Sequence, residues 1–211
     1  MELALFPLSA VLFSGCRIPL QIFEQRYLDL VKQHLLSQRP FGLVTLKGDP
    51  AQQVAQRIED EVPDVPELLP HGTLANIVDF NHQANGLLGI VIEGGEQFRV
   101  QRCWYADDLL VEAEVEPLPA EEVVPVPDEQ DDLLPILLSL QDHPFIERLG
   151  YRLPDDAEYW MQDTGRLANH LAALFPLPLR EQYALLELRD PIQRLSVVQA
   201  LLSQLSGEAS V

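Results

Sequence analysis

Few side chains in this sequence have the types and spacing that covalent chemistry requires. The most suggestive run is Ser14-Gly15-Cys16, because a serine or cysteine can act as a nucleophile when a neighbouring base activates it. The run precedes Pro19 in an apolar stretch, and the chain has no G-x-S-x-G nucleophile elbow. We therefore expect Cys16 to be a small buried hydrophobic side chain, and the sequence predicts no catalytic residue.

Paired acids are the second kind of candidate for chemistry. Asp107-Asp108, Glu121-Glu122 and Asp131-Asp132 offer the two carboxylates that general acid–base catalysis uses. In a chain with 33 acidic residues, such pairs more often belong to solvated surfaces. A hydrolase whose site is assembled from scattered acids or from Cys16 is kept as an alternative hypothesis.

Metal and cofactor motifs give no support to a bound group. The five histidines are scattered along the chain, H-E-x-x-H is missing, and the two cysteines lack the spacing of zinc ligands. Neither G-x-x-x-x-G-K-[ST] nor G-x-G-x-x-G occurs, so no phosphate-binding loop is expected. The prediction is a protein with no metal and no cofactor.

Charge and composition narrow the class of partner. The 211 residues hold 33 acids against 14 bases, for a net charge of -19, which disfavours nucleic acid and anionic membrane surfaces. Hydrophobic residues make up 47% and the mean hydropathy is +0.01, as in a soluble globular protein. Two cysteines, no signal-peptide pattern and no long apolar run favour a reducing cytoplasm. Residues 1–50 carry 4 acids and 5 bases, so their surface should be the least charged and the best suited to apolar contacts.

The elements expected in the first half of the chain are mostly strands. One amphipathic helix is predicted over 21–38, because apolar residues recur there every three or four positions and Pro40 follows. A solvated excursion is expected over 48–70, and turns over 81–85 and 93–96. The predicted strands are two short ones within 3–13, then 41–46, 73–80, 86–93, 97–105 and 109–115. Residues 1–118 therefore predict a mostly antiparallel sheet or barrel with one packed helix.

The second half of the chain changes to a helical period. Four prolines between 116 and 128 predict a semi-extended linker. Helices are expected over 131–141, 156–175 and 179–188, with a last one starting at Asp190-Pro191, where Asp is the N-cap. The predicted fold is α+β, with a β subdomain (1–118), a linker (119–127) and a C-terminal helical bundle (128–211).

Several motifs resemble the Lon protease N-terminal domain family, particularly small bacterial proteins built from that domain alone. Residues 6–8 (FPL) and 12–15 (LFSG) precede residues 18–27 (IPLQIFEQRY), as in the opening signature of this family, with Ser14 in place of the usual proline. Further matching segments follow in the family's order, namely 72–77 (GTLANI), 92–100 (IEGGEQFRV, with Gln97 where Arg is common) and 182–195 (QYALLELRDPIQRL).

This resemblance implies a PUA-like β pseudobarrel followed by helices, and a role in recognising unfolded protein substrates. The ATPase and serine-lysine peptidase domains of full-length Lon do not fit in 211 residues, and no position here matches the catalytic Ser or Lys. The leading hypothesis is therefore a non-catalytic module that binds exposed apolar or unfolded segments of a protein or peptide partner. PUA-like barrels elsewhere bind RNA, but three bases against thirteen acids between 51 and 120 make RNA binding the least favoured alternative. The sequence leaves the oligomeric state open.

The candidate peptide-binding residues are Phe23, Tyr27 and Arg26. Phe23 and Tyr27 are four residues apart, so on one helix they would share a face that either anchors the helix to the sheet or receives apolar side chains of a peptide. Glu24 and Arg26 are expected to tie the Pro19 loop to the sheet. Three glycines, Gly15, Gly72 and Gly95, are predicted to lie in turns.

Overall fold

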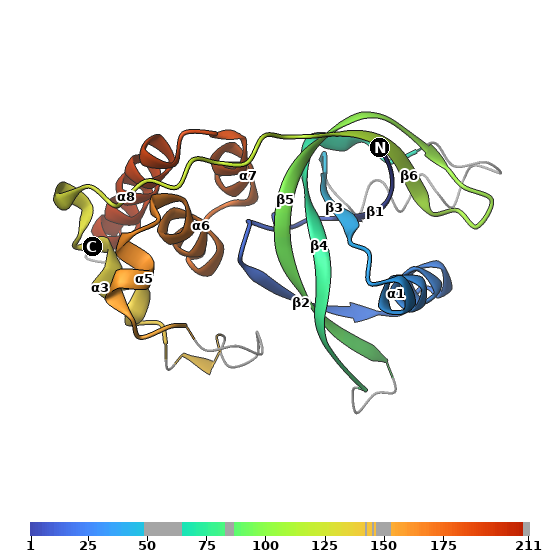
Figure 1. Cartoon of the computed structure of the whole chain (residues 1–211), viewed down its shortest axis with the longest axis horizontal. Coiled ribbons are helices and arrows are strands. Elements are labelled where there is room, and N and C mark those ends of the chain that lie inside the picture. Colours follow the sequence, from blue (N-terminus) through green and yellow to red (C-terminus); the bar gives the residue numbers. More distant parts are fainter. Residues whose placement is uncertain (49–64, 83–86, 142, 145, 147–152, 209–211) are drawn as a thin grey trace.

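The computed structural model describes residues 1–48, 65–82, 87–141, 143, 144, 146 and 153–208. Figure 1 shows the strands and the first helix on one side of the molecule and the remaining helices on the other. Most of the predicted excursion over 48–70, and part of the turn over 81–85, lie outside the described residues. The strands are β1 (Glu2–Leu8), β2 (Arg17–Ile22), β3 (Phe41–Leu46), β4 (Leu68–His82), β5 (Leu88–Tyr105) and β6 (Val111–Pro117).

These six strands form one mixed sheet that closes on itself. Their order is β2-β5-β4-β3-β1-β6, and β5 also pairs with β6. β1 and β3 are parallel, with Leu5 opposite Gly42, whereas the other pairs are antiparallel. The sheet is thus mixed, with one parallel pair among antiparallel ones. Its membership of the PUA-like class stays a prediction.

The turn predicted over 93–96 is wrong, because β5 runs without interruption through Gly94 and Gly95. A glycine is needed at position 94 because the backbone of residues 13–16 passes close to β5 there. A Cβ at this position would lie 2.2 Å from the carbonyl oxygen of Phe13. The Gly15 N–H donates to the Gly94 carbonyl at 2.8 Å, and the Gly94 N–H donates to the Cys16 carbonyl at 2.9 Å. Gly72 likewise lies inside β4, where a Cβ would meet the ring of Phe98 at 2.5 Å. Of the three glycines predicted in turns, Gly15 has the left-handed φ of 77°.

The helix after β2 begins later than predicted. α1 spans Gln25–Ser37, because Gln21 and Ile22 belong to β2, where Ile22 pairs with Leu88. It ends at Ser37, because the C-cap Gln38 adopts a left-handed conformation, and the Gln38 N–H makes the last helical hydrogen bond to the carbonyl of His34. The prediction of one helix over this region is correct in type and wrong by four residues at its start.

The second half of the chain is helical, as predicted. A 3-10 turn, η1 (Asp128–Gln130), leads into α3 (Leu133–Leu138), α5 (Ala157–Met161), α6 (Thr164–Leu174), α7 (Leu179–Glu187) and α8 (Pro191–Glu208). The single helix expected over 156–175 is two helices, because Asp163 caps a new N-terminus by accepting from the Arg166 N–H at 3.0 Å. Asp190 caps α8 as predicted, accepting from the backbone N–H groups of Ile192 and Gln193.

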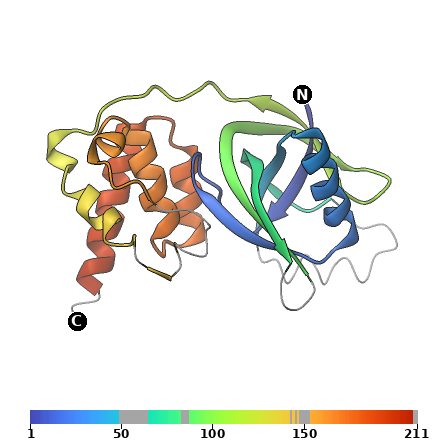
Figure 2. The ribbon, with the colours of Figure 1, turned by 60° about the horizontal axis from the view of Figure 1, so that its bottom comes forward.

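Residues 118–127 connect the two halves in an extended conformation, and we call this segment the strap. Figure 2 shows it arching from β6 over to the helices. Its conformation agrees with a semi-extended linker, while the division at 118 and 128 into separate subdomains stays a prediction. Within the described part of the chain, none of the helices has the length and apolar character needed to cross a membrane.

Candidate functional site

Residues 9–16 lie between the sheet half and the helical half and pack against both. Side chains alternate in direction, so that Val11 and Phe13 join the buried cluster of the helical half while Leu12 joins a cluster of the sheet. The Thr73 hydroxyl donates to the Leu12 carbonyl at 2.6 Å, and the Ser14 hydroxyl donates to the carbonyl of Gly95 at 2.7 Å. The two halves therefore share one packed interface built on this segment.

The strap is bonded to both halves. At its start, the Leu118 N–H donates to the Gln97 carbonyl at 2.9 Å. Further along, the buried Thr164 donates from its backbone N–H to the Val124 carbonyl at 2.8 Å and from its hydroxyl to the Val124 and Pro125 carbonyls, each at 2.9 Å. Val126 is buried in the helical core. An extended, proline-rich segment is thus held on the helices by backbone hydrogen bonds.

Arg194 of α8 is fully buried, and its side chain holds the strap on the helices. Its guanidinium pairs with the carboxylate of Glu121 and donates to Asn169 Oδ1 at 3.0 Å. It also donates to the carbonyls of Leu185, at 3.1 Å from Nε, and Leu188 at the end of α7. A buried charge is tolerable only when it is paired and hydrogen-bonded in this way. The arginine of the 182–195 motif is therefore a structural centre that joins α6, α7, α8 and the strap.

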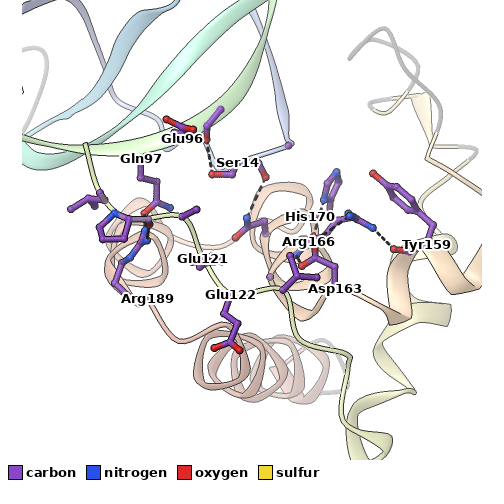
Figure 3. Close-up of a pocket in the computed structure, with 18 residues that line it drawn as sticks. Ser14, Glu96, Gln97, Glu121, Glu122, Tyr159, Asp163, Arg166, His170 and Arg189 are labelled. Atoms are coloured by element: carbon purple, nitrogen blue, oxygen red, sulfur yellow. Dashed lines mark hydrogen bonds and ion pairs between the residues drawn. The ribbon is translucent and has the colours of Figure 1, made fainter. Parts of the chain in front are cut away.

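A cavity of about 410 Å³ lies where the sheet half, the strap and α6 meet. Figure 3 shows its walls: Ser14 and Gln97 from the sheet half, Glu121 from the strap, and His170 and Arg189 from the helical half. Its volume lies within the range of roughly 300–1,000 Å³ that is typical of small-ligand sites. It is the candidate site with the most polar groups directed toward one space.

Two of the three arginines at this cavity pair with carboxylates, and the third has neutral partners. The Arg166 guanidinium lies 3.1 Å from Asp163 Oδ2 and stacks on the ring of Tyr159, 3.9 Å from its centroid. Glu121 is neutralised by Arg194. Arg189 donates to Gln97 Oε1 at 2.6 Å and to the carbonyl of Pro119.

Burial keeps two titratable groups near the cavity neutral. Burial lowers the pKa of His170 to about 4, while its Nδ1 lies 2.9 Å from the Arg166 carbonyl and its ring packs edge-on against Trp160. Burial also raises the pKa of the Cys16 thiol well above its ordinary value, and the side chain is 2% exposed. A protonated, inaccessible thiol is not a nucleophile, and Cys16 is the buried hydrophobic side chain that the sequence predicted. Among the described residues, no three His, Cys, Asp or Glu side chains are placed to hold a metal ion.

The three predicted site residues do not share one surface. Phe23 precedes α1 and is 72% exposed, whereas Tyr27 is buried and stacks on Phe6 with ring centroids 4.1 Å apart. The prediction that Phe23 and Tyr27 share a helix face is therefore wrong, and Tyr27 anchors α1 to the sheet. Arg26 pairs with Glu24, donates to the Leu109 carbonyl at 2.7 Å and lies over the Tyr27 ring. It ties α1 to the turn before β6, while Pro19 lies inside β2 and not in a loop.

The cavity was not predicted from the sequence. Its residues come from segments that are more than 150 positions apart, as the hydrogen bond from Asn169 Nδ2 to the Ser14 carbonyl shows. The sequence did mark two of the segments that contribute to this site, because the motifs at 92–100 and 182–195 contain Gln97, Arg189 and Arg194. Their contact in space could not be read from either motif alone.

Known proteins similar to this chain share its fold over nearly its whole length. The family model for the ATP-dependent protease La (LON) substrate-binding domain matches residues 2–204. A solved structure of the Lon N-terminal domain protein from Xanthomonas campestris is 29% identical, with a TM-score of 0.68, and covers 95% of this chain and 98% of its own. The N-terminal domain of a Mycobacterium avium complex Lon protease, 17% identical with a TM-score of 0.59, covers 94% and 96% and shows the same fold.

Curated relatives are much longer than this chain. Lon protease 2 of Myxococcus xanthus is 29% identical over 209 residues, which are 96% of this chain and 23% of the relative. Lon protease of Vibrio parahaemolyticus is 22% identical over 212 residues, 99% of this chain and 25% of the relative. The chain spans about a quarter of the length of these relatives. Given the family match over residues 2–204, the chain belongs to the LON substrate-binding domain family.

Proposed function

We propose that this chain binds exposed apolar or unfolded segments of other proteins and carries out no catalysis itself. The observation that carries the proposal is the family match, because the matched domain is described as substrate-binding and spans residues 2–204. Two observations near the central cavity support the second part, since Asp163 and Glu121 are each paired with an arginine and the thiol of Cys16 is buried and protonated.

Exposed apolar side chains near one end of the sheet support the first part. Phe23 follows β2, and Val78 and Phe80 lie near the end of β4 with exposed fractions of 41% and 59%. β5 runs between these strands, and its Leu88 is paired with Ile22 on one side and His82 on the other. Figure 1 shows this end of β2, β4 and β5 beside the start of α1. We call Phe23, Val78 and Phe80 the apolar end surface, and we propose it as the contact for unfolded segments.

The backbone of β4 favours side-chain contacts here over strand addition. Asp79 Oδ1 accepts the Phe80 N–H at 2.8 Å, so a donor that an added strand would use is already satisfied. The Asp79 carboxylate also places a negative charge at this part of the strand. Charged side chains at a strand edge discourage pairing with another strand. The partner is therefore expected to present apolar side chains to Phe23 and Phe80.

The proposal is tested with fluorescein-labelled apolar peptides and the double variant Phe23→Ser/Phe80→Ser. Fluorescence anisotropy should show saturable binding by the wild type and at least about tenfold weaker binding by the variant, as expected when two aromatic anchors are lost. The matched control is Ile192→Ser/Val197→Ser, which removes exposed apolar side chains from α8. Equal losses in both variants, or millimolar affinities across a diverse panel, would contradict the proposed surface.

The alternatives have less support. A hydrolase built on Cys16 would need an accessible thiolate, and burial opposes both conditions. RNA binding would need a basic surface, whereas the chain has a net charge of -19. A cytoplasmic location is part of the proposal, supported by the sparse cysteine content.

A further inference from the structure

Arg189 is a cation in the central cavity whose observed partners are all neutral. Its guanidinium donates to Gln97 Oε1 at 2.6 Å and to the Pro119 carbonyl. Among the described residues it has no carboxylate within ion-pair distance, although the chain has 33 acids for 14 bases. The two other arginines at the cavity, Arg166 and Arg194, each have an acidic partner. A partly buried guanidinium without a counter-charge favours an anionic ligand.

Gln97 supplies a second donor beside Arg189. A guanidinium can only donate, so the Gln97 side-chain oxygen must face it and the amide nitrogen Nε2 is directed elsewhere. Gln97 is 7% exposed, and Nε2 makes no hydrogen bond to any residue that the structure describes. It is not among the fully enclosed unpartnered atoms of the described residues, so part of its surface is open, and Gln97 is one of the residues that line the cavity. A nearly buried amide donor without an acceptor points to a ligand that brings one.

The acidic residues of the cavity limit the charge that the rest of a ligand can carry. Glu121 and Asp163 are neutralised by Arg194 and Arg166. Glu96 and Glu122 have no cationic partner among the described residues, and Figure 3 shows the Glu122 carboxylate directed away from Arg189 toward α8. A second negative charge on the ligand would be repelled by these two carboxylates, whereas a neutral or cationic group would be tolerated.

We infer that the cavity binds a carboxylate, with Arg189 and Gln97 Nε2 as its donors, on a ligand that is otherwise neutral or cationic. A carboxylate accepts from a guanidinium and an amide together, and the cavity of about 410 Å³ holds a ligand as large as a short peptide end. The carboxylate comes either from the C-terminus of a polypeptide or from a small carboxylic acid. This site is separate from the apolar end surface and does not depend on it.

The test compares two N-terminally fluorescein-labelled five-residue peptides of Gly, Ala and one Lys, one with a free C-terminal carboxylate and one amidated. The free acid should bind roughly 10- to 100-fold more tightly than the amide, the range expected for hydrogen bonds to a charged group. N-acetylalanine is then added as a competitor. Displacement at similar concentration assigns a small carboxylic acid as a sufficient ligand, and displacement only at much higher concentration assigns the peptide C-terminus. Equal binding of acid and amide, or no binding of either peptide or of N-acetylalanine up to about 10 mM, would overturn the inference.

Two variants separate binding from folding. Gln97→Glu places a carboxylate of the same shape against Arg189, so it should remove the preference for the free acid without lowering the melting temperature. Arg189→Gln should remove the same preference, and Arg180→Gln, which changes a 91% exposed arginine of α7, should leave it unchanged. Persistence of the preference in both Gln97→Glu and Arg189→Gln would contradict the site. Binding of apolar peptides to Phe23 and Phe80 should be unaffected in all three, so the two proposals fail independently.

Discussion

Gly94 permits the closest approach between the segment 9–16 and the sheet. Adding one methyl group there would place Cβ 2.2 Å from the Phe13 carbonyl oxygen, and backbone atoms rather than a movable side-chain end would have to shift. We expect Gly94→Ala to lower the free energy of unfolding by about 3 kcal/mol, the upper part of the usual range for overpacking.

The neighbouring glycine is the matched control for this prediction. At Gly95 the nearest atom to an added Cβ is Asn76 Nδ2 at 3.4 Å, so Gly95→Ala should change the free energy of unfolding by less than about 1 kcal/mol. Urea titrations of the two variants provide the measurement. Equal destabilisation by the two substitutions would mean that the crossing at Phe13 is not tight.

His170 makes the stability of the folded protein depend on pH. Burial lowers its pKa to about 4, and of the charges around it Arg166 acts in the same direction while Glu93 and Asp163 oppose it. Between about pH 6.5 and pH 4 the unfolded chain therefore binds a proton that the folded chain does not, so this group's contribution to stability falls as the pH falls through that window.

Replacing His170 with Gln should remove this contribution. Relative to wild type, the variant's free energy of unfolding is expected to rise by roughly 2–3 kcal/mol between pH 7.5 and pH 4.5. Ser203→Ala, which changes an exposed residue of α8 and no titratable group, provides the control and should follow the wild-type pH profile. Parallel curves for wild type and His170→Gln in urea would show that His170 is not buried as a neutral group.

For single residues, the sequence predicted which side chains are buried better than it predicted which residues they bond to. Cys16 could be predicted as a buried hydrophobic side chain because apolar residues surround it. The role of Arg194 could not be predicted, because its partners Glu121, Asn169 and the carbonyl of Leu185 come from three separate segments. Phe23 and Tyr27 were placed on one helix because a spacing of four residues cannot show where the strand before the helix ends.

The strap behaves as an element of the fold rather than as a free linker. Thr164 holds its middle through three hydrogen bonds, and Arg194 holds Glu121. Thr164→Val keeps the shape of the side chain and removes the two hydroxyl bonds, leaving the carbonyls of Val124 and Pro125 with fewer donors. We expect limited proteolysis with a glutamate-specific protease to cut after Glu121 or Glu122 about tenfold faster in this variant, because opening of the strap costs less free energy.

Mass spectrometry of the fragments gives the measurement for the strap. Ser203→Ala, which removes an exposed hydroxyl that bonds only to the Gln199 carbonyl within α8, is the control and should be cut at the wild-type rate. Rapid cleavage of the wild-type strap at these two glutamates would show that the segment is free in solution.

Element types were largely predictable, while breaks between elements were not. Periods of three to four residues correctly predicted α1, α7 and α8, and Asp190-Pro191 correctly predicted where α8 begins. The division between α5 and α6 was missed although the polar run Gln162-Asp163-Thr164-Gly165 interrupts the apolar pattern there, with Asp163 as the N-cap of α6. The interruption predicted in β5 was wrong because a glycine pair indicates a turn as readily as it indicates a place where another backbone crosses.

For the whole molecule, the sheet half and the helical half act as one unit. Val11, Phe13 and Cys16 from the sheet side are part of the helical core, and Tyr183 of α7 accepts a hydrogen bond from the His71 N–H at 2.9 Å. Both proposed contacts lie on this common body, with the apolar end surface at the end of the sheet and the cavity at the junction of the halves. The two proposals thus concern different parts of the same molecule.

The central claim is that this protein recognises the unfolded state of other proteins without cutting them. The most direct measurement is an anisotropy titration with one small, basic, disulfide-bonded protein in two labelled forms, native and reduced with its thiols alkylated. We predict micromolar binding of the unfolded form, at least about tenfold weaker binding of the native form, and an intact labelled chain after incubation with ATP. Equal affinity for the two forms, or conversion of the label into fragments, would contradict the claim.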